Sequence, residues 1–357
     1  MTGTRGTATL HRRGLGLPVW AWILAGIVLV GAIGALVWWL LTPDAKPEPA
    51  RDRDRFALTQ AYLQADQYDK AVADLEAMRS QDPADAETYY WLYRAHTRSG
   101  ALDTAAQVVS QLEAAVKDGD VGLDGLFWLF EIYGEKGDRA AQQQALADLA
   151  AAVEDEPNDS AGHFMLGQAY NRSGELEQAA AEFRRVLELD PSNSAAHHNL
   201  GVTYFQLLDS AAAVSEFEAA LELDPDDADT HYQLGATYLV LALSGSEPGT
   251  VDEELFQQAI SQFERALELE PNKPEALIGM GNVHLLRGDS SAAIAALELA
   301  IEQAPDQPEA YYALGAAYAQ GGNQAQACET YDHFLALELS PTWRTQAEQD
   351  MAQWGCP

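Results

Sequence analysis

Three histidines and two cysteines are the residues whose types and spacing could do chemistry in this sequence. His163, His197 and His231 follow one another at intervals of 34 residues, and a regular series of imidazoles suggests a metal or haem site. If the interval reflects stacked helix pairs, equivalent residues lie about 10 Å or more apart, because each helix contact spans about 8–10 Å. Ligands of one zinc ion lie about 2.0 Å from it. We therefore expect each ring to pack against a neighbouring helix, and we predict no metal site and no cofactor.

The two cysteines, Cys328 and Cys356, are the only ones in the chain. A turn at Ser340 and Pro341 would place them on two antiparallel helices at similar distances from that turn. A disulfide needs Cα atoms about 4.4–6.8 Å apart, which this geometry allows. We predict that the bond staples the last helix to the preceding one; the alternative is two unrelated thiols, one buried and one at the tail. Since disulfides persist in oxidising compartments, the prediction also bears on location.

No other residue pattern indicates an enzyme. The carboxylates follow the solvent-exposed faces expected of amphipathic helices, as in ELEQAAAEFRRVLELD. No Ser-His-Asp spacing, phosphate-binding loop or haem-attachment motif occurs in the sequence. The net charge of −34 at pH 7 disfavours nucleic acid and anionic lipid surfaces as partners, because like charges repel. We expect a protein without catalytic activity.

The sequence repeats itself at a period that explains the histidine spacing. LELDP stands at 187–191 and 221–225, and LELEP follows at 267–271. HFMLGQAY, HHNLGVTY, HYQLGATY, LIGMGNVH and YYALGAAY align with one another. The recurring columns are a glycine, an aromatic residue or histidine three positions later, an alanine in the following segment, and a closing proline. The glycine column consists of Gly167, Gly201, Gly235, Gly281 and Gly315.

Each column has a physical role in a pair of antiparallel helices. Glycine and alanine remove side chains where two helices approach closely, and larger residues fill the space between them. Proline ends one helix and opens the next, because it cannot donate an interior backbone hydrogen bond. The pattern resembles the tetratricopeptide repeat (TPR) family, whose period is about 34 residues. The resemblance implies an all-α fold, a right-handed TPR solenoid of helix-turn-helix repeats that binds other proteins.

The pattern predicts eight repeats and a final helix. Thr59, Tyr93 and Phe130 stand at the glycine column upstream, so the first three repeats are degenerate and their helices should pack differently. The sixth repeat is 12 residues longer than the period, and the surplus falls in a loop that contains Gly and Pro. A Ser-Pro pair opens the last helix, which we expect to cap the apolar end of the stack. The predicted ranges are 52–159 for the degenerate repeats 1–3, 160–340 for repeats 4–8, about 241–255 for the loop and 341–357 for the capping helix.

The N-terminal region predicts one transmembrane helix. Residues 17–41 carry no charged side chain and have tryptophans towards both ends; at about 1.5 Å per residue, this length exceeds the roughly 30 Å core of a bilayer. A cleavable signal peptide is the alternative, but its apolar region is usually about 7–15 residues long. Arginines in the short basic segment 1–16 place the N-terminus in the cytoplasm by the positive-inside rule. The helix would then cross the inner membrane, and the proline-containing linker 42–51 would connect it to periplasmic repeats.

In TPR proteins the first helix of each repeat lines a concave groove that holds a peptide or a partner helix. By this resemblance, the groove here is aromatic and mildly polar, which suits apolar or aromatic anchors on a partner. Alternatively, some of these rings fill contacts between helices. Capture of a C-terminal carboxylate is poorly supported, because few groove side chains suit it. The predicted groove residues are Phe164, Gln168, Asn171, Arg172, His198, Phe205, Tyr232, Ile278, Asn282 and Tyr312.

We interpret the chain as a membrane-anchored, extracytoplasmic TPR scaffold that binds other proteins, for assembly or stabilisation of a membrane or exported complex. Its expected partners are proteins, bound as a peptide or helix in the groove, and the lipid bilayer through the N-terminal helix. A permanent accessory subunit of a respiratory or photosynthetic membrane complex is one alternative. A cytosol-facing TPR receptor, which needs the opposite orientation, is another.

Overall fold

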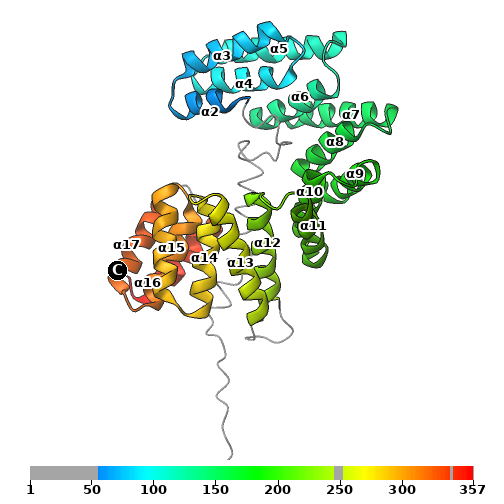
Figure 1. Ribbon diagram of the computed structural model, residues 1–357. Helices are drawn as coiled ribbons and strands as arrows, with labels where there is room; N and C mark the ends of the chain where they lie inside the picture. The colour runs from blue at the N-terminus through cyan, green and yellow to red at the C-terminus, as the bar shows by residue number, and fades with distance from the viewer. Residues whose placement is uncertain (1–54, 245–251, 338–340, 357) are drawn as a thin grey trace, which may run out of the picture. The chain divides into compact units, whose positions relative to one another are not determined.

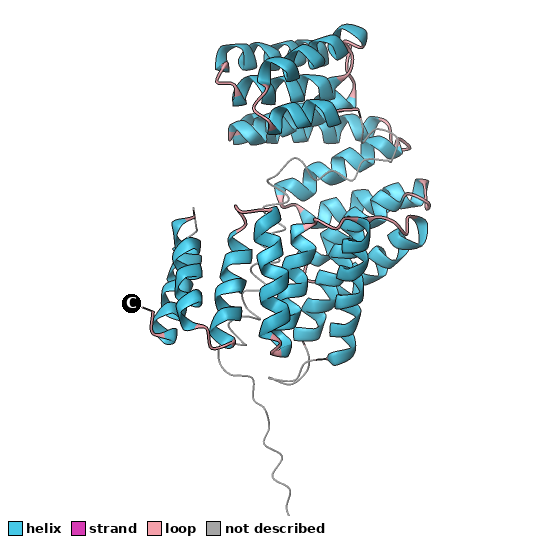
Figure 2. Cartoon of the chain, turned by 60° about the vertical axis from the view of Figure 1, so that its left-hand side comes forward, coloured by secondary structure: helices cyan, strands magenta, loops and turns pink. Residues whose placement is uncertain are grey.

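Seventeen α-helices form the regular structure of the residues that the computed structural model describes, 55–244, 252–337 and 341–356 (Figure 1). No strand occurs in these ranges (Figure 2). The all-helical prediction is confirmed. The predicted anchor at 17–41, its linker and residues 245–251 of the predicted loop lie outside the described residues. The outer ends of the predicted loop are helical instead, because the flanking helices extend to Leu243 and start again at Glu253. Of the described helices, none is both long enough and apolar enough to cross a membrane.

The described helices fall into two compact bodies, which separate between Asp226 and Asp227. Most helices pack against the helix that follows them in the chain. The N-terminal body contains α2 (Ala57–Gln64), α3 (Tyr68–Gln81), α4 (Ala86–Arg98), α5 (Leu102–Asp118), α6 (Leu123–Lys136), α7 (Arg139–Asp155), α8 (Ser160–Ser173), α9 (Leu176–Leu189), α10 (Ser194–Gln206) and α11 (Ser210–Leu223). The C-terminal body contains α12 (Ala228–Leu243), α13 (Glu253–Leu269), α14 (Pro274–Arg287), α15 (Ser290–Gln303), α16 (Pro308–Gln320), α17 (Gln324–Ala336) and α18 (Pro341–Trp354).

Polar side chains and prolines begin many of these helices. The side chains of Asp159 and Asn193 accept hydrogen bonds from backbone N–H groups in the first turns of α8 and α10. Such caps satisfy N–H groups that have no partner inside the helix. Pro274 and Pro308 stand in the first turn of α14 and α16. Backbone N–H groups in a first turn have no partner inside the helix, so proline, which has no N–H, costs no hydrogen bond there. Local chemistry therefore determines where these helices start.

The glycine column lets a large side chain on the second helix of a repeat press against the backbone of the first. A Cβ atom added at Gly167 would lie 2.9 Å from the Phe183 ring, and one at Gly201 would lie 2.7 Å from the Phe217 ring. Both rings are fully buried, so neither can move aside easily. The same contact pairs Gly235 with Phe263, Gly281 with Leu297 and Gly315 with Tyr331.

Two of the degenerate repeats reverse this size relation. Where later repeats have glycine, Tyr93 and Phe130 are large and buried. The residues 16 positions further on, which correspond to the buried rings of later repeats, are Val109 and Leu146. The large side chain has therefore moved from the second helix to the first. Exchanges that keep the total volume are the ones a packed interface tolerates best.

The turn between the two helices of a repeat contains another special position, which the column comparison did not single out. Backbone φ is positive there at Gly100, Gly137, Gly174, Gly288 and Gly322. Asp66 and Leu208 take the same position in two other repeats, with φ of 54° and 63°. This conformation costs an L-residue about 1–2 kcal/mol. Leu208 is also 69% exposed, so a strained backbone here carries an apolar side chain that is in contact with solvent.

The final helix, α18, packs against the end of the C-terminal body. Trp343 stacks on Phe334 of α17 with ring centroids 5.7 Å apart, and Ala347 is fully buried. Arg344 donates a hydrogen bond to the backbone oxygen of Leu335 over 3.0 Å. These contacts cover apolar surface that a following repeat would otherwise cover.

Candidate functional site

Each histidine of the 34-residue series bonds to the second helix of its own repeat. The pairs are His163 Nδ1 with Glu182 Oε2 at 2.6 Å, His197 Nδ1 with Glu216 Oε2 at 2.7 Å, and His231 Nδ1 with Gln262 Oε1 at 2.7 Å. The rings therefore connect two helices of one repeat, and their nearest polar partners are not other histidines. Within the described ranges, no three His, Cys, Asp or Glu side chains are grouped as metal ligands would be.

In the N-terminal body, the predicted groove rings pack against rings of the second helices. The ring centroids of Phe164 and Phe183 are 5.7 Å apart, and those of His198 and Phe217 are 5.8 Å apart, both in T-shaped contacts. Phe164 stays half-buried, whereas His198 is 1% exposed and Phe205 is 6% exposed. Phe164 is therefore the predicted groove ring that a partner could reach in this body.

The polar groove residues of the same body mostly bind neighbouring helices. The Asn171 amide donates to Thr203 Oγ1 over 2.8 Å, which joins α8 to α10 inside the body. Arg172 forms an ion pair with Glu131 of α6, and burial lowers the pKa of Arg172. Gln168 is half-buried, and its side-chain amide forms no hydrogen bond with any described residue. Arg172 and Asn171 therefore hold helices together, and Gln168 is the polar side chain available to a partner.

In the C-terminal body, two of the predicted groove residues remain accessible. Tyr232 is half-buried, with its ring centroid 6.1 Å from that of Phe263, and burial raises its pKa. Ile278 is 8% exposed. Asn282 lies one turn further along α14 and is half-buried, and its side-chain amide hydrogen-bonds to no residue in the described part of the chain. Tyr232 and Asn282 thus offer a ring and an unpaired amide.

Tyr312, the last predicted groove residue, lies beneath α18. Its ring centroid is 5.6 Å from that of Tyr331 and 6.1 Å from that of Trp343. Its hydroxyl donates to the carboxylate of Asp350, and burial raises the pKa values of both groups. Only 4% of Tyr312 is exposed. The capping helix occupies the space where a partner would contact this ring, so Tyr312 does not line an open groove while α18 is docked.

Models of known protein families match this sequence and identify the family to which the chain belongs. A model of TPR repeats matches residues 167–207 and 210–240, and a second tetratricopeptide repeat model matches 62–121 and 251–318. A third tetratricopeptide repeat model matches 309–337. These matches together cover more than half of the chain. The chain belongs to the tetratricopeptide repeat family. No curated protein matches its sequence significantly.

Solved structures share the TPR fold. Yeast Tom70 matches with a TM-score of 0.58 and 15% identity, over 95% of this chain and 74% of that one. The APC/C hetero-tetramer Cut9-Hcn1 also matches with a TM-score of 0.58 and 15% identity, over 80% of this chain and 52% of that one. YrrB, described as a TPR protein with an unusual peptide-binding site, is 25% identical over 56% of this chain and 97% of its own, with a TM-score of 0.43. The first two likenesses show the fold alone, and the third is too distant in structure to support an argument.

A disulfide ends the TPR array. Cys328 of α17 and Cys356 after α18 are bonded, with their Cα atoms 5.4 Å apart. This separation lies within the range that disulfides require. The bond closes a loop across a sequence separation of 28 residues and so ties the capping helix to the last TPR repeat.

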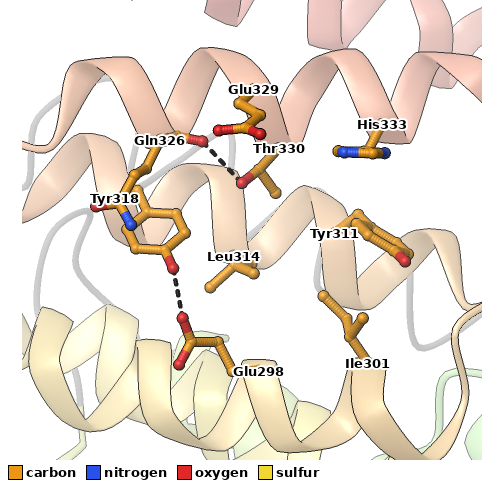
Figure 3. A pocket seen from close by; sticks show the side chains of 9 residues that line it. All are labelled: Glu298, Ile301, Tyr311, Leu314, Tyr318, Gln326, Glu329, Thr330 and His333. Atoms are coloured by element: carbon orange, nitrogen blue, oxygen red, sulfur yellow. Dashed lines mark hydrogen bonds between the residues drawn. The ribbon is translucent and has the colours of Figure 1, made fainter.

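The repeat pattern did not reveal a cavity on another face of the last TPR repeat. The cavity has a volume of 280 Å³ and lies among α15, α16 and α17 (Figure 3). Tyr311, Leu314 and Tyr318 of α16 contribute to it, with Glu298 from α15 and Glu329 from α17. The signal that could have found it is a departure from the repeat: Glu329 stands where the preceding repeat has Ala295.

Proposed function

We propose that this TPR protein is a membrane-anchored, extracytoplasmic scaffold that binds other proteins, for assembly or stabilisation of a membrane or exported complex. The run of TPR repeats is the observation that carries the binding role. Among the predicted groove residues, each body keeps one accessible ring and one side-chain amide without a hydrogen bond to described residues: Phe164 and Gln168 in one, Tyr232 and Asn282 in the other. An aromatic contact and a free amide suit a peptide that offers an apolar anchor and backbone hydrogen-bonding groups.

The proposed location is supported by the N-terminal sequence and by the disulfide. Residues 17–41 are uncharged and follow three arginines, which favours an inner-membrane anchor with a cytoplasmic N-terminus. The bond between Cys328 and Cys356 favours repeats in an oxidising compartment, because cytosolic thiols are kept reduced. A cytosol-facing receptor is therefore the less well supported orientation.

Protease treatment of spheroplasts tests the orientation. We expect added protease to digest the repeats of the full-length protein without lysis, and cysteine alkylation without reductant to leave Cys328 and Cys356 unmodified. A cytoplasmic marker protein that stays intact is the control. Repeats that survive until lysis, with two alkylated cysteines, would replace this proposal with the cytosol-facing receptor.

Site-specific photo-crosslinking tests the binding surface. A photoreactive phenylalanine analogue at Asn282 should form a discrete adduct with a partner protein in intact cells. The same analogue at Gln257, an exposed position on α13, is the matched control and should form none. Equal adduct formation at both positions would contradict a groove at Asn282. Co-purification in mild detergent then distinguishes a permanent subunit, which stays bound, from a transient adaptor.

A further inference from the structure

We propose that the cavity among α15, α16 and α17 binds a cationic side chain, an arginine or lysine presented by a basic segment of a partner protein. The inference rests on the proposed protein-binding role but concerns a different surface. Tyr311, Leu314 and Tyr318 recur at helical spacing and face the cavity (Figure 3). Tyr312, one residue away from Tyr311, instead packs beneath α18. At 280 Å³, the cavity has room for a single long side chain.

Aromatic rings form the two ends of the cavity. Leu314 is its apolar floor on α16, and only 6% of this side chain is exposed. Tyr311 lies beside His333 of α17 in a stacked arrangement, with ring centroids 6.3 Å apart. Tyr318 closes the opposite end (Figure 3). Faces of tyrosine rings attract guanidinium and ammonium groups within about 6 Å of their centres.

Carboxylates stand on both walls. The Tyr318 hydroxyl donates to Glu298 Oε1 over 2.5 Å, and burial, this hydrogen bond and the nearby charges of Glu298 and Glu329 raise the pKa of Tyr318 to about 12. Tyr318 therefore stays a donor and holds the Glu298 carboxylate at the wall. Glu329 is exposed and forms no ion pair within the described part of the chain. No lysine or arginine is among the residues that line the cavity, so the cavity is negatively charged.

The fold itself does not require these residues. In three earlier repeats the position of Thr330 carries Glu182, Glu216 or Gln262, and each bonds a histidine at the position of Tyr311. Thr330 is shorter and donates to the backbone oxygen of Gln326 in its own helix over 2.8 Å, which leaves space in front of Tyr311. The position of Glu329 is occupied by a small residue in the other four regular repeats, namely Ala181, Ser215, Ser261 and Ala295.

The electrostatics of the chain favour the same ligand. The net charge of −34 at pH 7 attracts basic partners over long distances. Such attraction brings a basic segment to the surface but does not select a position. The cavity determines where the basic segment binds, because its rings and its two carboxylates act together on one cationic group at short range.

Peptide binding to the full-length protein in mild detergent tests the inference. The probe is a fluorine-labelled heptapeptide, Gly-Ser-Gly-Arg-Gly-Ser-Gly, and its control contains citrulline, which keeps the shape of arginine without the charge. We expect ¹⁹F NMR to show at least tenfold weaker binding of the citrulline peptide. Glu329→Ala, which restores the residue type of the preceding repeat, should weaken arginine-peptide binding about fivefold. Glu302→Ala removes the same charge from an exposed α15 position that does not line the cavity and should change binding less than twofold.

Tyr311→Leu, again a residue type found in the preceding repeat, should also weaken binding while circular dichroism shows an unchanged melting transition. Equal binding of the two peptides, or equal losses in Glu329→Ala and Glu302→Ala, would overturn the inference. Free arginine that binds as tightly as the peptide would overturn the assignment to a partner protein. Adduct formation at Asn282 without arginine-peptide binding would refute this inference alone, whereas arginine-peptide binding without adducts at Asn282 would refute only the proposed groove.

Discussion

The contact between the glycine column and the buried rings gives a quantitative prediction for Gly201→Ala. The added Cβ would lie 2.7 Å and 2.8 Å from two carbon atoms of Phe217, and Phe217 is fully buried. Overpacking of this kind costs about 1–3 kcal/mol. The better helix propensity of alanine returns about 1 kcal/mol. We therefore expect a net destabilisation of about 1 kcal/mol, measured as a lower midpoint of urea unfolding.

A double-mutant cycle isolates the contact. Phe217→Leu should be destabilising alone, yet Gly201→Ala combined with Phe217→Leu should cost at least about 0.5 kcal/mol less than the sum of the two single changes, because the smaller residue makes room for the methyl group. Gly134→Ala is the control: its Cβ would meet the end of the Gln142 side chain, which can move, so stability should rise or stay constant. A stable Gly201→Ala variant, or strict additivity in the cycle, would refute the interlocking of glycine and ring.

Three further predictions concern the end of the array and one turn. Cys356→Ser should increase amide hydrogen exchange in α18, because in the chain-entropy model a loop of 28 residues contributes about 3.5 kcal/mol; unchanged exchange would show that packing alone holds the helix. Leu208→Gly should raise stability by about 0.5–1 kcal/mol by relieving a positive φ, whereas Leu102→Gly, in a normal helical conformation, should lower it. The pKa of Asp350 is raised, because the effect of burial exceeds the opposite effect of the hydrogen bonds from Tyr312 and Gln346. A carboxyl group whose pKa is raised in the folded state lowers the free energy of unfolding once the pH exceeds the pKa of the unfolded state, about 3.9. Asp350→Asn should therefore remove a loss of stability between about pH 4 and neutral pH, and identical pH profiles for variant and wild type would contradict this assignment.

Much of the fold was predictable from the residue columns that recur along the sequence, because each column marks a helix contact that recurs in the regular repeats. Gly201 and its equivalents mark where two helices approach, and that role was predictable without coordinates. The positive φ of Leu208 was not, because leucine gives no sign of a left-handed backbone; the glycine that stands seven residues after the column position in five other repeats was the available signal. The compensation at Tyr93 and Val109 also escaped prediction, since it appears only when two positions 16 residues apart are considered together.

The candidate groove was less predictable than the fold. A position in the repeat tells which face of a helix a residue occupies, but not what lies across from it. His198 and Phe164 hold equivalent positions, yet His198 is 1% exposed and Phe164 is half-buried. Arg172 is neutralised by Glu131, which comes from a different repeat. Tyr312 is covered by α18, whose docking depends on contacts outside the repeat pattern.

Departures from a repeat separate into those that the chain compensates and those that it does not. Tyr93 in place of glycine is matched by Val109 in place of a ring, so that departure preserves packing and needs no function. Glu329 and Thr330 have no such compensation: together they replace a small residue and an inter-helix hydrogen bond with a charged, open cavity. Leu208 likewise exposes an apolar side chain on a strained backbone. Sequences otherwise consistent with their fold tend to break local rules at functional positions. The uncompensated departures are therefore where binding experiments on this TPR protein should begin.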